Sequence, residues 1–106
     1  MNRSKALQLT YHSTVIAELE IVDSDQPWID CEFTSLETFS EHRDFFYDYQ
    51  KTYSSGTVMD WDEFFNQLSN FGYRLSNQHY EIKRFILILS DSECKARVRG
   101  KRVKST

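Results

Sequence analysis

The sequence has few of the residues that break regular structure or cross-link a chain. Only one of its 106 residues is proline and three are glycine, and its two cysteines, Cys31 and Cys94, lack CxxC spacing. Two isolated cysteines predict free, buried thiols, because disulfide frameworks and metal sites need regularly spaced ligands. No apolar run approaches the roughly 18 residues of a membrane-spanning helix, so no membrane association is expected.

The chain also lacks recognisable targeting and catalytic signals. Residues 1–5 have no apolar block after them of the kind found in a secretory signal peptide, which predicts a cytoplasmic protein. No repeat, linker or cofactor motif is present, and no convergent acid, base and nucleophile can be named. We therefore predict that the protein is not an enzyme and needs no cofactor.

Acidic residues are missing from the end of the chain. All 16 of them lie in residues 1–94 beside only seven basic residues, whereas residues 95–106 hold six basic residues and no acid. The two parts therefore favour partners of opposite charge. We expect residues 1–100 to form a single α+β domain and residues 101–106 to form a basic, frayed tail.

Five segments alternate apolar and polar side chains with the period of a β-strand. Three come first, at about residues 7–11, 15–21 and 29–33, and two follow at about residues 80–89 and 94–99. Short connections between them favour antiparallel neighbours. Residues 73–75 are expected to lead from the second helix into a polar loop.

Two segments in the middle of the chain repeat apolar residues with helical spacing. The first follows a capping-box pattern at Thr34–Glu37 and is predicted to end near Tyr53. The second is predicted to begin at an acidic cap, Asp60–Glu63, and to end at Gly72. The expected fold is α+β, a five-stranded, mainly antiparallel sheet with two helices on one face and the order βββααββ. The residues expected to be most buried are Phe46, Trp61, Phe64, Leu68, Phe85 and Leu87.

Scattered aromatic and turn positions form a further pattern along the chain. They lie in residues 9–12, 15–19, 27–28, 71–75 and 85–98, together with Phe33 and Phe39. In these positions the chain resembles a family of small uncharacterised bacterial α+β proteins. The resemblance implies a fold of that class and carries no activity, cofactor or catalytic residue.

Clustered carboxylates suggest a cation site in two places, but each cluster has a simpler explanation. Asp60, Asp62 and Glu63 stand at a predicted helix N-terminus, where carboxylates cap amides and offset the helix dipole. The acidic stretch that follows Asp23 has Trp28 where a calcium loop needs glycine. We therefore predict no metal site.

The first predicted helix carries acidic and aromatic residues outside its apolar stripe. Trp28, which follows the only proline, is a second candidate for an exposed aromatic residue. Two interpretations stay open for the flanking rings. They pack against further core neighbours, or they form a protein-binding face in which an aromatic anchor is framed by carboxylates. The candidate protein-binding residues are Trp28, Glu41, Asp44, Phe45, Tyr47 and Asp48.

The basic C-terminal segment has three possible roles. The residues concerned are Lys95, Arg97, Arg99, Lys101, Arg102 and Lys104. They could follow the phosphates of a nucleic acid, protect an edge strand against aggregation, or contact the acidic body of the protein. The segment has no interleaved aromatic residues and the acidic body would repel a polyanion, so nucleic-acid binding is the weaker prediction.

Charge and size together favour a non-catalytic domain that binds another protein. One version is a bacterial immunity protein that neutralises a toxin, because many toxins have basic clefts and opposite charge speeds encounter. The alternative is a nucleic-acid-binding protein that uses residues 95–104. We expect a monomer or weak dimer.

Overall fold

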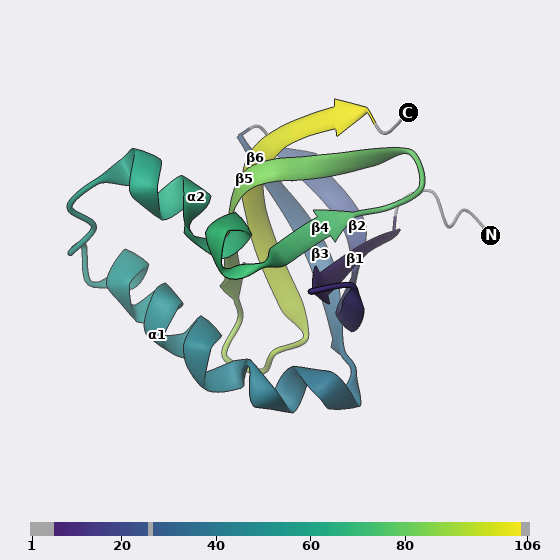
Figure 1. Cartoon of the computed structure of the whole chain (residues 1–106), viewed down its shortest axis with the longest axis horizontal. Coiled ribbons are helices and arrows are strands. Elements are labelled where there is room, and N and C mark those ends of the chain that lie inside the picture. The colour runs from purple at the N-terminus through teal and green to yellow at the C-terminus, as the bar shows by residue number, and fades with distance from the viewer. Residues whose placement is uncertain (1–5, 26, 105–106) are drawn as a thin grey trace.

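Six β-strands of the described residues, 6–25 and 27–104, close into a barrel in the computed structural model (Figure 1). The strands are β1 (Ala6–Tyr11), β2 (Thr14–Asp25), β3 (Trp28–Ser35), β4 (Tyr73–Ser76), β5 (Tyr80–Leu89) and β6 (Lys95–Lys104). Their order around the barrel is β1-β2-β3-β6-β5-β4, and β4 pairs back onto β1. Every neighbouring pair is antiparallel. Closure removes the two free edges that an open sheet would present.

The prediction of a five-stranded sheet is therefore wrong, and β4 is the main reason. The sequence predicts a loop after Gly72, but Tyr73–Ser76 pair with β1 on one side and with β5 on the other. Leu75 lies opposite both Leu9 and Ile82 and is fully buried. The element order is three strands, a 3-10 helix, two α-helices and three strands.

The last strand is longer than the sequence indicates. β6 continues to Lys104, and residues 101–104 pair in register with Tyr80–Lys83 of β5. The expectation of a frayed tail fails for these residues, because antiparallel pairing satisfies backbone groups that a free end would leave to water. Residues 105–106 lie outside the described residues.

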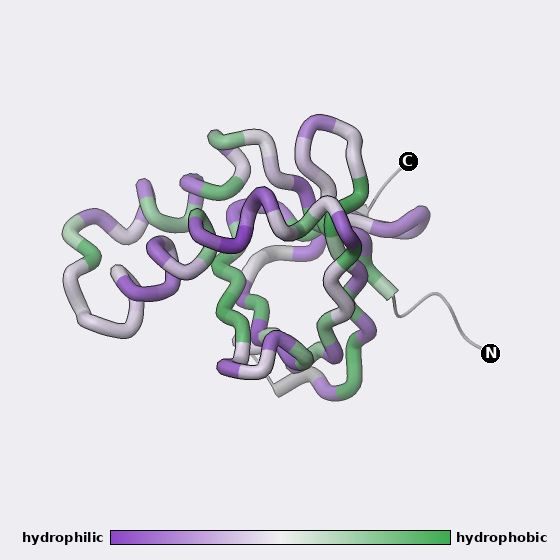
Figure 2. Tube along the Cα trace, turned by 90° about the horizontal axis from the view of Figure 1, so that it is seen from below, coloured by the Kyte–Doolittle hydropathy of each residue, from purple (hydrophilic) through white to green (hydrophobic). Residues whose placement is uncertain are grey.

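The barrel interior is built from the apolar side of each strand. Buried residues lie directly opposite one another in the pairs Leu7–Leu19, Leu19–Phe33, Ile29–Val98 and Leu87–Val98. Opposite side chains share a face, so these pairs form one continuous core. Glu18 and Glu20, at alternate positions of β2, are exposed. Figure 2 shows this alternation of hydropathy along a ring of strands, with the helices extending to one side.

The helical segments cover one side and one end of the barrel. They are the 3-10 helix η2 (Glu37–Glu41) and the α-helices α1 (Arg43–Ser54) and α2 (Trp61–Phe71). Helix α2 packs on β5 and β4, whereas η2 packs on β2. Among the described residues, no helix combines the length and the apolarity that crossing a membrane requires.

The predicted capping box at Thr34–Glu37 does not form. Ser35 is still part of β3 and pairs with Ala17, so the strand extends through the residues expected to cap a helix. The first helical turn is 3-10, and its N-cap residue, Leu36, makes no side-chain cap bond. The Thr38 hydroxyl instead donates to the Val15 carbonyl at 2.9 Å and ties η2 to β2.

The predicted ends of the second helix are confirmed. The Asp60 carboxylate accepts a hydrogen bond from the Glu63 amide at 3.2 Å, as an N-cap does. Gly72 ends the helix in the left-handed region, with φ 108°, and its amide donates to Leu68 and Ser69. An added Cβ on Gly72 would also lie 2.5 Å from the His12 ring, so both conformation and space favour glycine.

Five of the six residues predicted to be most buried are buried, and Trp61 is the exception. Trp61 occupies the first position of α2, and its ring contacts are with Tyr53 and Phe64 of the helical layer. The apolar stripe of α2 thus continues past the barrel wall. Helical periodicity reports which side of a helix is apolar and not how far the wall beneath it extends.

Candidate functional site

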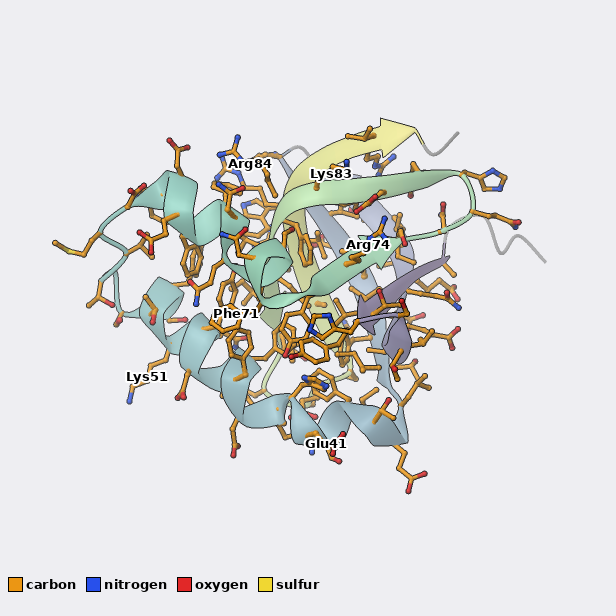
Figure 3. All side chains as sticks on the ribbon, viewed as in Figure 1. Glu41, Lys51, Phe71, Arg74, Lys83 and Arg84 are labelled. Carbon is orange, nitrogen blue, oxygen red and sulfur yellow. The ribbon has the colours of Figure 1, made fainter. Side chains whose placement is uncertain are left out.

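The outward side of α1 carries the acidic residues that the sequence places there. Phe46 and Tyr49 are buried, which leaves Asp44, Tyr47 and Asp48 exposed on the opposite side. Glu41, at the end of η2, is also exposed, and Figure 3 shows it at the lower edge of the molecule, away from the barrel. Four predicted protein-binding residues therefore lie on one exposed stretch of η2 and α1.

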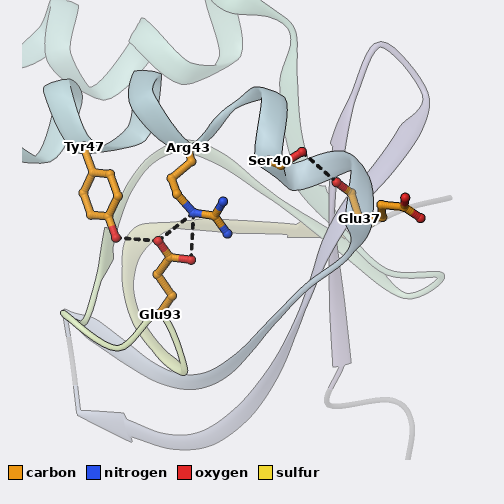
Figure 4. A network of polar contacts seen from close by, with 5 residues as sticks. All are labelled: Glu37, Ser40, Arg43, Tyr47 and Glu93. Carbon is orange, nitrogen blue, oxygen red and sulfur yellow. Dashed lines mark hydrogen bonds and ion pairs between the residues drawn. The ribbon is translucent and has the colours of Figure 1, made fainter.

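Tyr47 is not a free anchor, because its hydroxyl is bonded within the molecule (Figure 4). It donates to Glu93 in the β5–β6 turn, and the same carboxylate accepts two bonds from Arg43 Nε at 2.8 and 3.0 Å. The bonds from Arg43 and Tyr47 hold the pKa of Glu93 below its ordinary value, and the bond to Glu93 raises the pKa of Tyr47. This network fastens the β5–β6 turn to α1.

Replacing Glu93 with glutamine is expected to lower the melting temperature at pH 7 but not in acid. The folded pKa of Glu93 lies below its unfolded value, so the ionised carboxylate stabilises the fold above the unfolded pKa. This contribution disappears as the pH falls through the folded pKa. Melting curves recorded at intervals from about pH 7 down to about pH 2 measure the difference. Asp91→Asn, in the same turn, is the matched control and should melt like the wild type. A deficit of Glu93→Gln that is equally large in acid would contradict the role of the ionised carboxylate.

Phe45 and Trp28 lie at the margin of the core, so for Phe45 the structure agrees with the interpretation as a core neighbour. Phe45 is half-buried, and its ring stacks 5.4 Å from Tyr73. Trp28 is half-buried as well, with Tyr53 at 6.2 Å and the Arg97 guanidinium 5.1 Å above its ring. Packing between the barrel and the helical layer therefore occupies both rings.

Two large apolar side chains are exposed close together at the α1–α2 loop, the end of the helical layer farthest from the barrel in Figure 1. Met59 is 96% exposed, and Trp61 is 52% exposed. Trp61 is held edge-on by Tyr53 at 6.1 Å and by Phe64 at 5.9 Å, so its position is defined despite its exposure. We call Met59 and Trp61 the Met59–Trp61 tip. Contiguous exposed apolar surface marks interaction sites, and these two side chains are candidates for such a surface.

A small hollow lies beside this tip. It has a volume of about 180 Å³, and Val58, Met59, Asp60 and Glu63 are among the residues that line it. Asp60 and Glu63 are both exposed, so the apolar tip is bordered by negative charge. An apolar anchor with a charged border has the anatomy of a protein–protein interface.

The apolar spacing of α2 predicts a buried Trp61, so this pattern does not indicate the Met59–Trp61 tip. Two other signals in the sequence do indicate its position. Met59 lies between the Gly56 break and the Asp60 cap, and segments between such signals are loops that run over the surface. Trp61 follows the cap directly and therefore belongs to the first turn of the helix. These signals give the position of the tip, but the exposure of Trp61 depends on where the barrel ends.

Lys95, Arg97 and Arg99 of β6 lie on the outside of the barrel, whereas Arg102 lies opposite the buried Ile82. Lys95, Arg97, Arg99 and Arg102 are exposed, while Ala96 and Val98 between them are buried. Arg97 donates to Asp30 of β3 at 3.0 Å. The side chains of Lys101 and Lys104 lie outside the described part of the structure, although both residues belong to β6.

Aromatic rings lie beneath the arginines of β6. The distances from guanidinium carbon to ring centroid are 5.1 Å for Arg97 over Trp28, 5.7 Å for Arg99 over Phe65 and 5.3 Å for Arg102 over Tyr80. None of these rings is adjacent to its arginine in the sequence. The fold therefore supplies the interleaved aromatic residues that the basic segment lacks.

The cysteines differ from each other in their surroundings. Cys31 is buried as predicted, and burial raises the pKa of its thiol to about 12, which suppresses the thiolate. The prediction of a buried thiol is wrong for Cys94, which lies exposed in the β5–β6 turn, 2.8 Å from the Ser92 hydroxyl. Within the described residues, no group of three His, Cys, Asp or Glu side chains is placed to hold a metal ion.

No protein-family model, curated protein or solved structure matches the chain. The resemblance to small bacterial α+β proteins therefore stays a prediction. The Met59–Trp61 tip and the arginine–aromatic surface of β6 are the features from which function can be argued.

Proposed function

We propose that the protein is a non-catalytic protein-binding domain and that the Met59–Trp61 tip is its anchor. The observation that carries the proposal is the exposure of these two residues close together, at 96% for Met59 and 52% for Trp61. Tryptophan and methionine are enriched in interfaces, and tryptophan dominates many binding hot spots. Because Tyr53 and Phe64 already hold the Trp61 ring, docking would immobilise little that is free beforehand.

The charge around the tip favours a partner with a basic surface. Asp60 and Glu63 border the tip, and Asp44 and Asp48 extend the exposed negative charge along α1. Complementary charge speeds encounter and disfavours acidic competitors. The partner that fits is a protein with an apolar pocket for the Trp61 ring inside a basic rim.

A toxin with a basic active cleft meets this description, and the protein would then act as an immunity protein. A toxin-like reading frame is expected directly upstream of the gene in that case. Co-expression with that toxin should restore growth, whereas co-expression of Trp61→Ala should not. Absence of such a reading frame would reject the toxin and leave the docking surface to be tested with another basic protein.

Trp61→Ala is expected to weaken partner binding by at least about 30-fold, chiefly through faster dissociation, because truncating a hot spot costs about 2 kcal/mol or more. Tagged wild-type protein would capture the partner from its source cells. Surface plasmon resonance with the purified partner would then give both rate constants for each variant. The double variant Asp44→Lys, Asp48→Lys should mainly slow association, with an effect that shrinks at high salt.

Phe71→Ala is the matched control for this experiment, because Phe71 is 53% exposed and stands at the opposite end of the same helix. It should leave both rate constants unchanged. If Tyr47→Ala speeds dissociation and Trp61→Ala does not, the docking face is the outward side of α1 and the proposed anchor is wrong. Melting curves of every variant separate lost binding from lost fold.

A further inference from the structure

We propose that the protein also binds single-stranded nucleic acid, in a cleft between α2 and the β5–β6 hairpin. The cleft has a volume of about 660 Å³. Asp62 and Phe65 line it from α2, and Lys83, Arg84, Arg99, Gly100 and Val103 line it from the hairpin. We call it the basic cleft. Its size lies in the range of ligand sites, and it does not include the Met59–Trp61 tip.

A β-bulge shapes the basic cleft. The register of β5 against β6 shifts between Lys83 and Ile86, and Arg84 within the shift has φ 52°. Positive φ strains an arginine, and such strain gathers at functional sites. The Arg84 guanidinium bonds to Asn66 and Asp62 of α2, each at 3.1 Å, and so spans the cleft. Figure 3 shows Lys83 and Arg84 near each other on β5, with Arg84 on the side of α2.

Gly100 allows β6 to pass close to this bulge. A Cβ added to it would lie 2.6 Å from the Ile82 side chain and 2.9 Å from the Phe85 Cβ. Both neighbours are buried and leave no room to shift. Glycine at this position therefore permits the bulge and the strand beside it to pack together.

Positive charge in the basic cleft is largely uncompensated. Among the described residues, Lys83 and Arg99 form no ion pair. Arg84 pairs with Asp62, but that side chain is 90% exposed, so the pair is screened by solvent. The register also places a second lysine, Lys101, opposite Lys83. Lys83, Arg84 and Arg99 line the same cleft, so a phosphate bound there would meet three cations.

The two halves of β6 differ in their acidic neighbours. Near the start of the strand, Lys95 lies opposite Glu32 of β3, and Arg97 lies opposite Asp30. The far half pairs with β5 alone, where the acidic residue, Glu81, is already held by Arg74 at 2.9 Å. Free positive charge therefore collects at the end of β6 that borders the cleft, as binding to phosphates requires.

One aromatic ring completes the arrangement. Phe65 lines the cleft from α2, lies 5.7 Å from the Arg99 guanidinium and is only half-buried. Proteins that bind single strands combine a basic groove with rings on which bases stack. The acidic surface elsewhere on the protein would repel a duplex more than a flexible strand that reaches only the cleft.

Fluorescence anisotropy with a labelled single strand of about 12 nucleotides tests the proposal. With three phosphate contacts, the dissociation constant should rise about 20-fold between about 50 and 200 mM salt. Lys83→Glu and Arg99→Glu should each weaken binding at least about tenfold at the lower salt. Phe65→Ala should weaken it at least about fivefold at both salt concentrations, because stacking does not depend on counterions.

Lys51→Glu is the matched control, because Lys51 is an exposed cation on α1, away from the cleft. It should bind the strand as the wild type does, and so should Trp61→Ala, which separates this site from the proposed protein-binding anchor. The proposal is overturned if Lys51→Glu weakens binding as much as Lys83→Glu, or if no binding is measurable at the lower salt. It also fails if AMP or inorganic phosphate competes as well as unlabelled strand, or if a duplex binds more tightly.

Discussion

Phe64→Ala is expected to lower the free energy of unfolding by about 3–5 kcal/mol, the largest loss that we expect from a single substitution in the helical layer. Phe64 is only 4% exposed, and its ring stacks on Tyr49 with centroids 4.5 Å apart and 4° between the planes. Alanine would leave a cavity between α1 and α2 that a close-packed interior does not refill. A domain of this size has about 5–15 kcal/mol of stability, so the melting temperature should fall by at least about 12 °C.

Phe71→Ala provides the comparison, because it deletes the same ring from the same helix. Phe71 is 53% exposed, and its nearest aromatic neighbour is Phe45 at 5.0 Å. Its loss should cost about 1 kcal/mol. Thermal and urea unfolding of both variants would measure the difference. Equal losses would mean that the inward side of α2 is not the one observed.

Local signals predicted β1, β3 and the second helix correctly. Alternation along residues 7–11 and 29–33 matches β1 and β3, because each strand has one side in the barrel and one in solvent. Asp60 and Gly72 bound α2 as expected, because capping depends on the residues of the helix end itself. These features can be predicted from neighbouring residues alone, without the contacts that distant parts of the chain make.

Barrel closure could not be predicted in the same way, because it depends on contacts between distant residues. Tyr73–Ser76 is a strand of four residues, too short to show a clear period, and it directly follows the cap at Gly72. It becomes a strand because it pairs with Gln8–Tyr11, from the other end of the sequence. The capping box failed for a related reason, since pairing with β2 extends β3 through Ser35.

The candidate functional surfaces also depend partly on local sequence and partly on contacts between distant residues. Exposure of Asp44 and Asp48 followed from helical spacing alone. Exposure of Trp61 depends on where the barrel wall ends, which the sequence of α2 does not contain. The placement of Phe65 beneath Arg99 likewise requires α2 to lie across the β5–β6 hairpin. Sites assembled from several elements therefore become visible only once the fold is known.

Leu75→Ala is expected to cost about 2–5 kcal/mol and to weaken the closure of the barrel. Leu75 is fully buried and lies opposite Leu9 of β1 on one side and Ile82 of β5 on the other. Since β4 has only four residues, few other side chains hold it in place. One substitution therefore acts on both contacts that close the barrel.

Hydrogen exchange distinguishes this effect from general destabilisation. The amides of Gln8–Tyr11 pair with β4, and their exchange should accelerate more than that of the β3 amides. The reason is that local opening requires only β1 and β4 to separate. Arg74→Ala is the control on the same strand. The Arg74 side chain is 66% exposed and pairs with Glu81 at the surface, so its loss should cost at most about 1 kcal/mol. If both variants lose the same stability and β1 exchanges no faster than β3, then β4 does not hold the barrel closed and the sheet behaves as an open one.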